Sequence, residues 1–480
     1  MMLDPRSCRR VPAAALRPPT TAPTTAPGHP ADGHPAADHQ TTGHPAAGHQ
    51  TTGEEHPLAG AGPPPAVPET VAAGPRAGRG PLRGRHGLAV LGPALVVSVA
   101  YLDPGNFATN MTAGSRYGPL LLWVIVLSNA VATGVQYLAC KVGIATGRDL
   151  PELCREHTPR PVTYALWGQA ELVAMATDLT EFVGGAVALH LLFGLPLLPA
   201  ALLVAALSLA LLVLAPEGRR RFETVTALLL LVLVAGFAYQ FVRAGSWHGT
   251  LSGLRPALAG NESLTLATGI VGATVMPHVI YLHSSLGKMP ATTPPEEKRR
   301  VLRGQRISLP LTLGLAGLVN AGMLALAATA LRSPGQGGES LDDFHDGLRL
   351  ALGPGAALAF ALALLASGLA SAGVGTFAGQ VIMRGFLHRR IPLLTRRLLT
   401  MTPPLAVLAT GIPPTQALLL SQIVLSCGIP CALGPLLWFT ARRSLMGSMA
   451  NHAATTALAT LACAAISVLN VLLVARAVHG

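Results

Sequence analysis

The chain has 480 residues, of which 50% are hydrophobic and only 12% are charged, and its formal net charge is +12. Soluble globular domains carry about twice that charged fraction, so this composition excludes an ordinary soluble protein and favours a bundle of membrane helices. A positive excess can indicate nucleic-acid binding. Here the basic residues lie in short loops between apolar stretches. We therefore predict that the chain is embedded in a lipid bilayer and has no nucleic-acid partner.

Residues 1–80 differ from the rest of the chain. They are rich in Pro, Ala, Gly, Thr and His and contain a repeated ten-residue unit, GHPAADHQTT at 33–42 and GHPAAGHQTT at 43–52. Such a segment has too few large apolar side chains to fold, and we predict a disordered cytoplasmic tail. Its histidines could gather metal ions weakly, but a tail of biased composition without a binding role is the favoured interpretation.

Residues 81–480 are predicted to form one transmembrane domain. From residue 87 onward, apolar stretches recur at about the 20 residues that a helix needs to cross a bilayer. We expect eleven transmembrane helices, at 88–113, 118–142, 167–193, 196–215, 224–244, 264–286, 308–332, 355–380, 394–411, 415–440 and 453–478.

The distribution of Lys and Arg predicts the orientation of this bundle. If the N-terminus is cytoplasmic, most Lys and Arg residues of the membrane part lie on the inside. Such a bias predicts a multi-pass protein of the inner (plasma) membrane, with a cytoplasmic N-terminus and an external C-terminus. The exceptions on the outside are Arg116, Arg243, Arg255, Arg332, Arg349 and Arg476.

Two spans contain residues that interrupt a helix. The first includes Asp103-Pro104-Gly105-Asn106 and the sixth includes Met276-Pro277-His278. Pro removes a backbone donor, and unwound backbone at membrane depth is tolerated where it lines a binding site. Corresponding breaks in two groups of five helices predict an inverted repeat, with repeats at about 87–245 and 264–440 and an extra helix at 453–478. Two ordinary proline kinks are the alternative.

The residues at the breaks predict a metal site. Asp103 at membrane depth needs a cation, and Asn106 adds an amide oxygen. Unwinding of the sixth span frees the carbonyl of Ala273, and Met276 adds a thioether sulfur. Mg²⁺ and Ca²⁺ gain nothing from sulfur, whereas Mn²⁺, Fe²⁺, Co²⁺ and Cd²⁺ tolerate or prefer it. The alternative for Met276 is simple apolar filling.

Further titratable residues predict a proton route. Glu171, Asp178 and Glu181 are spaced by seven and three residues, so they share one face of the third span. His278 beside the second break, and His283 beyond it, have side chains that titrate near neutral pH. The alternatives are a structural ion network for the acids and satisfied interhelical hydrogen bonds for the histidines.

The motifs resemble a known family. DPGNFATN and MPHVIYLHSS closely resemble the two signatures of the NRAMP proton-coupled divalent-metal transporters, with support from QYLACKVGIATGRDLPELCRE, QAELVAMATDLTEFVGGA, GQVIMRGF and LSQIVLSCGIP. The resemblance covers about residues 87–445 and is strongest to bacterial manganese transporters. It implies a LeuT-like 5+5 inverted repeat with broken helices 1 and 6.

The resemblance also implies roles for individual residues. The family's metal ligands match Asp103, Asn106, the Ala273 carbonyl and Met276. Gln422 matches a residue that joins the metal in one conformation. Asp178 and Glu181 match proton-path acids, with which Arg396 and Arg397 pair. The chain departs from the family pattern at Val279, where Asn is usual, and at Arg384, where Glu is usual. Their effects on proton coupling and on a cytoplasmic gate stay open.

Together these features predict a secondary active transporter that imports Mn²⁺, and also Fe²⁺, Co²⁺ or Cd²⁺, coupled to protons by alternating access. We expect no enzymatic activity and no cofactor, the metal being the substrate, and a monomer. The alternatives are a sodium-coupled carrier of an organic solute, a magnesium carrier and a membrane-embedded metalloenzyme. The anionic side chain of Asp103 disfavours a carrier of an anionic organic solute. The thioether of Met276 disfavours a magnesium carrier. No HExxH arrangement supports the third.

Overall fold

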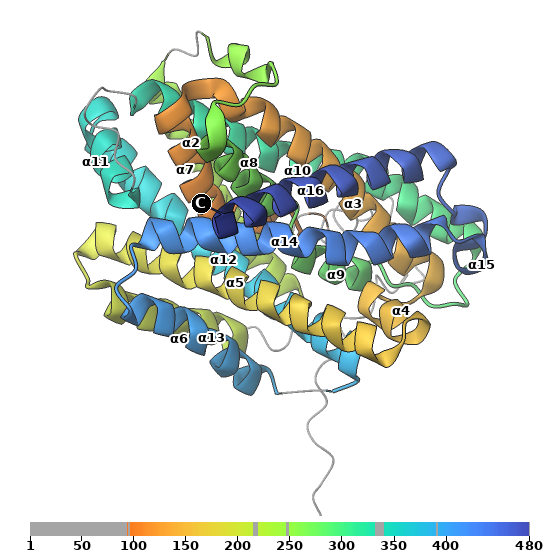
Figure 1. Cartoon of the computed structure of the whole chain (residues 1–480). Helices are drawn as coiled ribbons and strands as arrows, with labels where there is room; N and C mark the ends of the chain where they lie inside the picture. Colours follow the sequence, from red (N-terminus) through yellow and green to blue (C-terminus); the bar gives the residue numbers. More distant parts are fainter. Residues whose placement is uncertain are drawn as a thin grey trace, which may run out of the picture. The chain divides into compact units, whose positions relative to one another are not determined.

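The computed structural model describes residues 94, 97–214, 219–245, 249–331, 340–389 and 392–479. These residues are mostly helical and include no β-strand (Figure 1). They belong to one compact unit within residues 65–480. The predicted all-α class is confirmed, and the predicted tail at 1–80 lies outside the described residues.

Eight helical stretches in the described ranges are long and apolar enough to cross a membrane. The first joins α2 (Pro104–Tyr117), the short 3-10 helix η2 (Gly118–Leu121) and α3 (Leu122–Thr146), and so covers two predicted spans. The shorter helices α6 (Leu197–Leu214) and α13 (Leu393–Ala409) occupy the fourth and ninth predicted spans. Each predicted span therefore contains helix. The others are α5 (Arg160–Phe193), α7 (Arg219–Ala244), α8 (Gly260–Thr274), α9 (Pro277–Leu286), α10 (Pro295–Ala330), α12 (Pro354–Leu387), α14 (Pro414–Ala441) and α16 (Ala453–His479).

Short helices connect some of the spans. Asp149 and Glu152 form a capping box that starts α4 (Leu150–His157), and Ser340 and Asp343 form another at the start of α11 (Leu341–Leu352). In such a box each side chain bonds a backbone N–H that the first turn leaves free. The remaining connections contain η3 (Thr250–Leu254), α15 (Arg443–Met446) and η4 (Gly447–Met449).

Both predicted helix breaks are present. Residues 97–100 are helical, Tyr101 and Leu102 form a turn, and α2 starts anew at Pro104. In the sixth span, α8 ends at Thr274, Met276 is extended, and Pro277 begins α9. Proline suits both restarts because its missing N–H falls where a helix has no internal acceptor for it.

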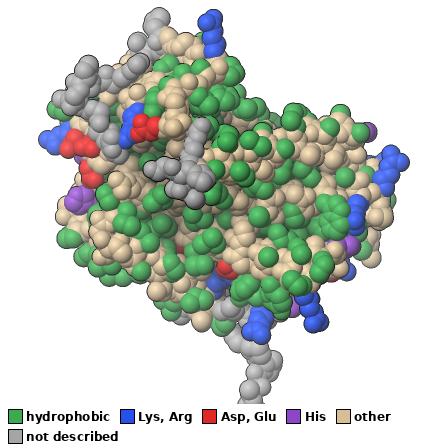
Figure 2. Space-filling model, in the orientation of Figure 1, with side chains coloured by type: hydrophobic (Ala, Val, Ile, Leu, Met, Phe, Trp, Pro, Cys, Tyr) green, Lys and Arg blue, Asp and Glu red, His purple; other side chains and the backbone are tan. Residues whose placement is uncertain are grey.

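The broken helices lie inside the bundle. In the most apolar 18-residue segment of Gly260–Leu286, 89% is buried inside the protein, whereas only 11% of the corresponding segment of Ala453–Ala475 is buried. Helix α2 packs against α8, α10 and α14, and α9 packs against α3 and α12. Hydrophobic side chains cover much of the face in Figure 2, with most Lys and Arg toward its rim. This pattern fits a lipid-facing surface around a more polar interior.

Candidate metal-binding site

Asp103 and Asn106 form the polar group at the first break. Asp103 caps α2, because its Oδ1 accepts from the Asn106 backbone N–H at 2.9 Å. The Asn106 side-chain amide nitrogen lies among three acceptors: Asp103 Oδ1 at 2.8 Å, the Ala273 carbonyl at 3.2 Å and the Tyr101 carbonyl at 3.2 Å. Thr180 donates to Asp103 Oδ2 at 3.3 Å. Asp103, Asn106 and Ala273 are thus brought together as predicted.

Gln422 approaches the same group from α14. A methyl group on Gly105 would lie 1.9 Å from Gln422 Nε2, so only glycine allows this close approach. Gln422 is fully buried, and its Oε1 has no hydrogen-bond partner. The oxygen of Asn106 is likewise buried without a partner. Two buried amide oxygens therefore retain free lone pairs. The Asn106 oxygen would face a cation next to Asp103 only after its amide turned, because the nitrogen now faces Asp103 and the Ala273 carbonyl.

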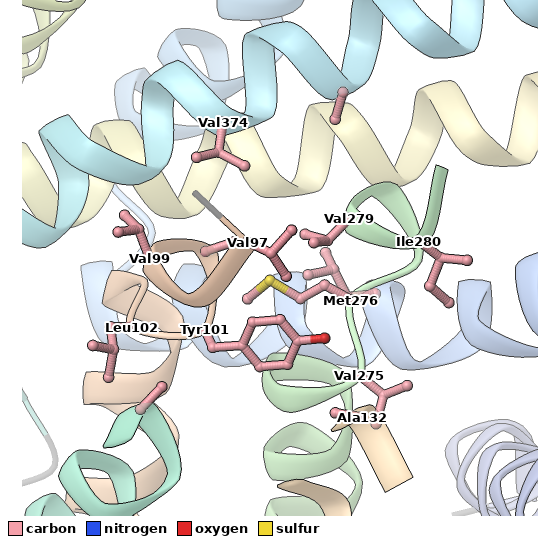
Figure 3. Close-up of a cluster of buried hydrophobic side chains, with 14 of the residues drawn as sticks. Val97, Val99, Tyr101, Leu102, Ala132, Val275, Met276, Val279, Ile280 and Val374 are labelled. Carbon is pink, nitrogen blue, oxygen red and sulfur yellow. The ribbon is translucent and has the colours of Figure 1, made fainter. Parts of the chain in front are cut away.

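Met276 belongs to the second break and is 1% exposed. Figure 3 shows its side chain extending from the second break toward the first span, where Val97 and Tyr101 are labelled. Met276 therefore lies within a largely apolar cluster between the two breaks. No polar contact of its sulfur is seen among the described residues, and a thioether is a flexible, weakly polar group.

The first break is held by two residues that sequence reasoning missed. Asn320 of α10 donates to the Tyr101 carbonyl at 2.9 Å, and its own oxygen accepts from Asn110 at 3.1 Å. Ser367 of α12 donates to the Leu102 carbonyl. Backbone groups freed by a break must be satisfied inside a membrane protein. The only sequence signal for Asn320 and Ser367 was that each is a polar residue in a predicted membrane span. Asn and Ser are too common in helices for that signal to identify these two.

The three predicted acids of α5 lie on one side of the helix and pair with α13. Arg396 donates to Glu171 Oε2 at 2.8 Å. Arg397 pairs with Asp178, and its Nη2 lies 3.4 Å from Glu181 Oε2. Asp178, Arg396 and Arg397 also line a small cavity. The predicted partnership of acids and arginines is therefore present in the structure.

The two predicted histidines contact different neighbours. His278 Nδ1 lies 3.2 Å from Thr177 Oγ1, on the same helix as the acids. His283 Nδ1 lies 3.0 Å from Gln136 Oε1, and Gln136 donates to the Tyr101 hydroxyl at 2.9 Å. Polar contacts thus link His283 to the first break and His278 to α5. A polar chain of this kind is compatible with either proton movement or structural hydrogen bonding.

The first break contains a single carboxylate. In the described ranges no three His, Cys, Asp or Glu side chains are grouped so that they could hold a metal ion. A cation at Asp103 would therefore meet one carboxylate and several neutral donors. Mg²⁺ is commonly held by one or two carboxylates and water, so the thioether of Met276, and not the number of carboxylates, would disfavour it.

Comparison with known proteins decides the family. Residues 94–476 match the family described as Nramp, natural resistance-associated macrophage protein-like. The chain is 46% identical over 404 residues to the divalent metal cation transporter MntH of Bacillus subtilis, covering 82% of this chain and 94% of that one. It is 48% identical over 383 residues to MntH of Deinococcus radiodurans, covering 78% and 87%. The chain belongs to the Nramp family.

Solved structures agree with this Nramp assignment. A variant of the Eremococcus coleocola manganese transporter is 31% identical and superposes with a TM-score of 0.74, over 82% of this chain and 88% of that one. Mhp1, a nucleobase-cation-symport-1 family transporter, has a TM-score of 0.57 at 15% identity and shows the fold alone. The predicted LeuT-like fold is confirmed. Because Nramp proteins are transporters, the enzyme alternative is excluded.

The two departures from the Nramp pattern lie in different environments. Val279 is fully buried within the apolar cluster of Figure 3. Arg384 lies near the end of α12, where its Nη2 is 3.4 Å from Ser285 Oγ and 3.8 Å from Asp149 Oδ2. Arg384 therefore contributes to an ionic cluster between α4, α9 and α12.

This ionic cluster centres on Lys288, just after α9. Lys288 Nζ lies 3.0 Å from Asp149 Oδ2 and 2.6 Å from Glu152 Oε2. Burial raises the pKa of Asp149, and the charge of Lys288 opposes that rise. Burial acts on Glu152 too, but the hydrogen bond from Lys288 holds its pKa below the ordinary value. The charge of Lys288 thus favours the ionised form of both acids beside α9.

We expect Lys288→Met to loosen the contact of α4 with α9. A charge-assisted hydrogen bond contributes about 1.5–3 kcal/mol, so local opening should become about 10- to 100-fold more frequent. Maleimide labelling of the buried Cys154 on α4, followed by peptide mass spectrometry, measures that opening. Lys298→Met, outside this cluster, is the matched control. An unchanged labelling rate would mean that the cluster does not hold these helices together.

Proposed function

We propose that this chain imports divalent transition-metal ions, Mn²⁺ first and also Fe²⁺, Co²⁺ or Cd²⁺, by alternating access coupled to protons. The observation that carries the proposal is the meeting of Asp103, Asn106 and the Ala273 carbonyl at two helix breaks, next to Gln422. Support comes from relatives that are named divalent metal cation transporters and from a manganese transporter of the same fold.

The proposed metal site has Asp103 as its only charged ligand. Asn106 and Gln422 supply amide oxygens, Ala273 its carbonyl, and Met276 its sulfur after rotation from the apolar cluster. The proposed proton route starts at Asp103 and passes through Thr180 and His278 toward Asp178 and Glu181, with Arg397 between the two acids. A dication next to Asp103 favours loss of its proton, which supplies the coupling.

The distribution of Lys and Arg suggests the membrane and the orientation that we propose for this chain. Lys and Arg gather at the loops that we assign to the cytoplasm, so the chain would lie in the plasma membrane with its C-terminus outside. An inward-negative potential favours cation entry by about 2.3 kcal/mol per charge per 100 mV. We propose a monomer as the working unit, because each chain contains both broken helices and all five proposed ligands.

The proposal is tested by metal uptake into proteoliposomes, with Mn²⁺, Mg²⁺ and Ca²⁺ compared at external pH 6 and 7.5. Met276→Ala should lower the preference for Mn²⁺ over Ca²⁺ by about tenfold or more, since only the transition metals gain from sulfur. Met289→Ala, a buried methionine outside the site, is the control. Equal Mn²⁺ and Ca²⁺ uptake by the unmodified protein would contradict the proposed substrate class.

A further inference from the structure

Within the described residues, several cations at one end of the bundle have no acidic partner, and five of them matter here. Lys141 lies near the end of α3, and the others lie in the first turns of α10: Lys298, Arg299, Arg303 and Arg306. In the described ranges, no carboxylate oxygen lies within 4.0 Å of a side-chain nitrogen of these five. Lys141 and Lys298 are only 7% and 8% exposed. Buried charges are normally paired, so the two buried lysines favour a nearby anion, whereas the three arginines are exposed.

Neutral contacts tie these cations to one another. Tyr137, Lys141 and Ala145 are one turn apart on α3 and so share a face. Arg306 Nε donates to the Tyr137 hydroxyl at 2.9 Å, and Lys298 Nζ to the Ala145 carbonyl at 3.4 Å. Lys141 donates to the amide oxygen of Asn451, beyond η4. Lys141, Lys298 and Arg306 are therefore held at the last turns of α3, where no carboxylate of the described residues pairs with them.

The described part of the chain does not neutralise this charge. The C-terminus of a helix carries about half a negative charge, which is small against five cations. Glu296 and Glu297 lie in the first turn of α10, but neither pairs with the cations. An anion from outside the described part of the chain would balance this positive charge.

An exposed apolar face continues from these cations. Arg303, Ile307, Leu311 and Leu318 follow each other on α10 at helical spacing, and the three apolar side chains are 67%, 65% and 67% exposed. The predicted span starts at residue 308, so this face adjoins the acyl chains of a bilayer. A free anion would contact only the cations, whereas a phospholipid would contact both the cations and this face.

A tryptophan marks the same membrane level. Trp438, near the end of α14, is 40% exposed, and the Arg442 guanidinium lies 3.7 Å from its ring centroid. The chain then continues into η4, where Ser448 accepts from Arg299 Nη2 at 3.2 Å. Trp is enriched at the level of lipid headgroups. In Figure 2, Lys and Arg side chains lie at the end where Figure 1 places α15.

We propose that Lys141, Arg303 and Arg306 bind the phosphate of an anionic phospholipid from the leaflet at this end of the bundle. Its acyl chains lie along Ile307, Leu311 and Leu318. Basic side chains near a membrane surface attract anionic lipids, and arginine suits phosphate oxygens because it can donate two parallel hydrogen bonds.

The test uses the full chain in detergent and measures its melting temperature with short-chain phosphatidylglycerol, short-chain phosphatidylcholine or inorganic phosphate. Phosphatidylglycerol should raise the melting temperature by about 2–4 °C at saturating concentration, whereas phosphatidylcholine and inorganic phosphate should not raise it. The double variant Arg303→Gln/Arg306→Gln should lose at least half of that shift, and Arg303→Lys/Arg306→Lys should keep most of it. Arg160→Gln, an exposed cation on α5, is the control and should keep all of it.

Three outcomes would overturn the proposal. An equal shift from phosphatidylcholine would show that the headgroup charge is not recognised. An equal shift from inorganic phosphate would assign the site to a free anion. A full shift in the glutamine double variant would place the lipid elsewhere. Both substituted arginines are exposed, so folding should survive, and native mass spectrometry of retained lipid gives a second measurement on the single variant Arg306→Gln.

Discussion

Asp103→Asn should lower Mn²⁺ affinity and uptake by at least about 100-fold, or about 2.8 kcal/mol. The substitution keeps the size and the hydrogen bond to the Asn106 backbone, but it removes the only formal charge among the five proposed ligands. Neutral oxygens and one sulfur cannot compensate for the desolvation of a dication. The loss should therefore appear in binding itself, measured by calorimetry, as well as in uptake by proteoliposomes.

The control for this variant is Asp346→Asn. Asp346 lies on α11 with a side chain that is 69% exposed, and among the described residues its ion-pair partner is the neighbouring His345. The Asp346→Asn substitution should leave Mn²⁺ affinity within twofold of that of the unmodified protein. If Asp103→Asn binds Mn²⁺ as well as this control does, the metal site is not at the break, and the sodium-coupled carrier of an organic solute becomes the leading alternative.

Arg397→Gln should destabilise the protein by about 3–5 kcal/mol. Arg397 is 2% exposed, pairs with Asp178 and Glu181, and lies 4.9 Å from the centroid of the Phe182 ring. Glutamine would leave two carboxylates buried without their cation, and that is more unfavourable than losing the whole ion group. Thermal unfolding in detergent measures the effect, with the exposed Arg389→Gln as control at about 0.5 kcal/mol or less.

A triple variant separates charge imbalance from simple loss of packing. Asp178→Asn and Glu181→Gln, combined with Arg397→Gln, remove all three charges and should recover at least half of the lost stability. The same variant should transport Mn²⁺ without stimulation by external acid, because the proposed proton acceptors are gone. No recovery of stability would mean that Arg397 acts through its contact with Phe182 and not through its charge.

Local chemistry made the breaks and the acidic face predictable. Pro104 and Pro277 each interrupt an apolar span, Asp103 before Pro104 is a charged residue at membrane depth, and Glu171, Asp178 and Glu181 obey helical periodicity. These signals depend only on neighbouring residues in the sequence. The pairing of α5 with α13 came from the family resemblance, because nothing in the spacing of Arg396 and Arg397 identifies their partners.

Long-range contacts explain what sequence reasoning missed. Asn320 and Ser367 bond the first break across 219 and 265 residues. Both are ordinary polar residues in long helices, and only the fold reveals what they bond. The cluster around Lys288 was missed for a different reason. Charged residues in loops usually lie in water, so the burial of Asp149 could not be read from its neighbours.

The orientation of the Asn106 amide has a consequence for the turnover of the transporter. Its nitrogen bonds three oxygens, two of which belong to proposed ligands of the metal. A metal ion that takes those oxygens must break these hydrogen bonds, and the amide must turn by half a rotation to offer its own oxygen. Binding is then an exchange of one set of contacts for another, which lowers the net affinity for the ion. Because the reverse rotation restores the three hydrogen bonds, the same amide would favour release of the ion.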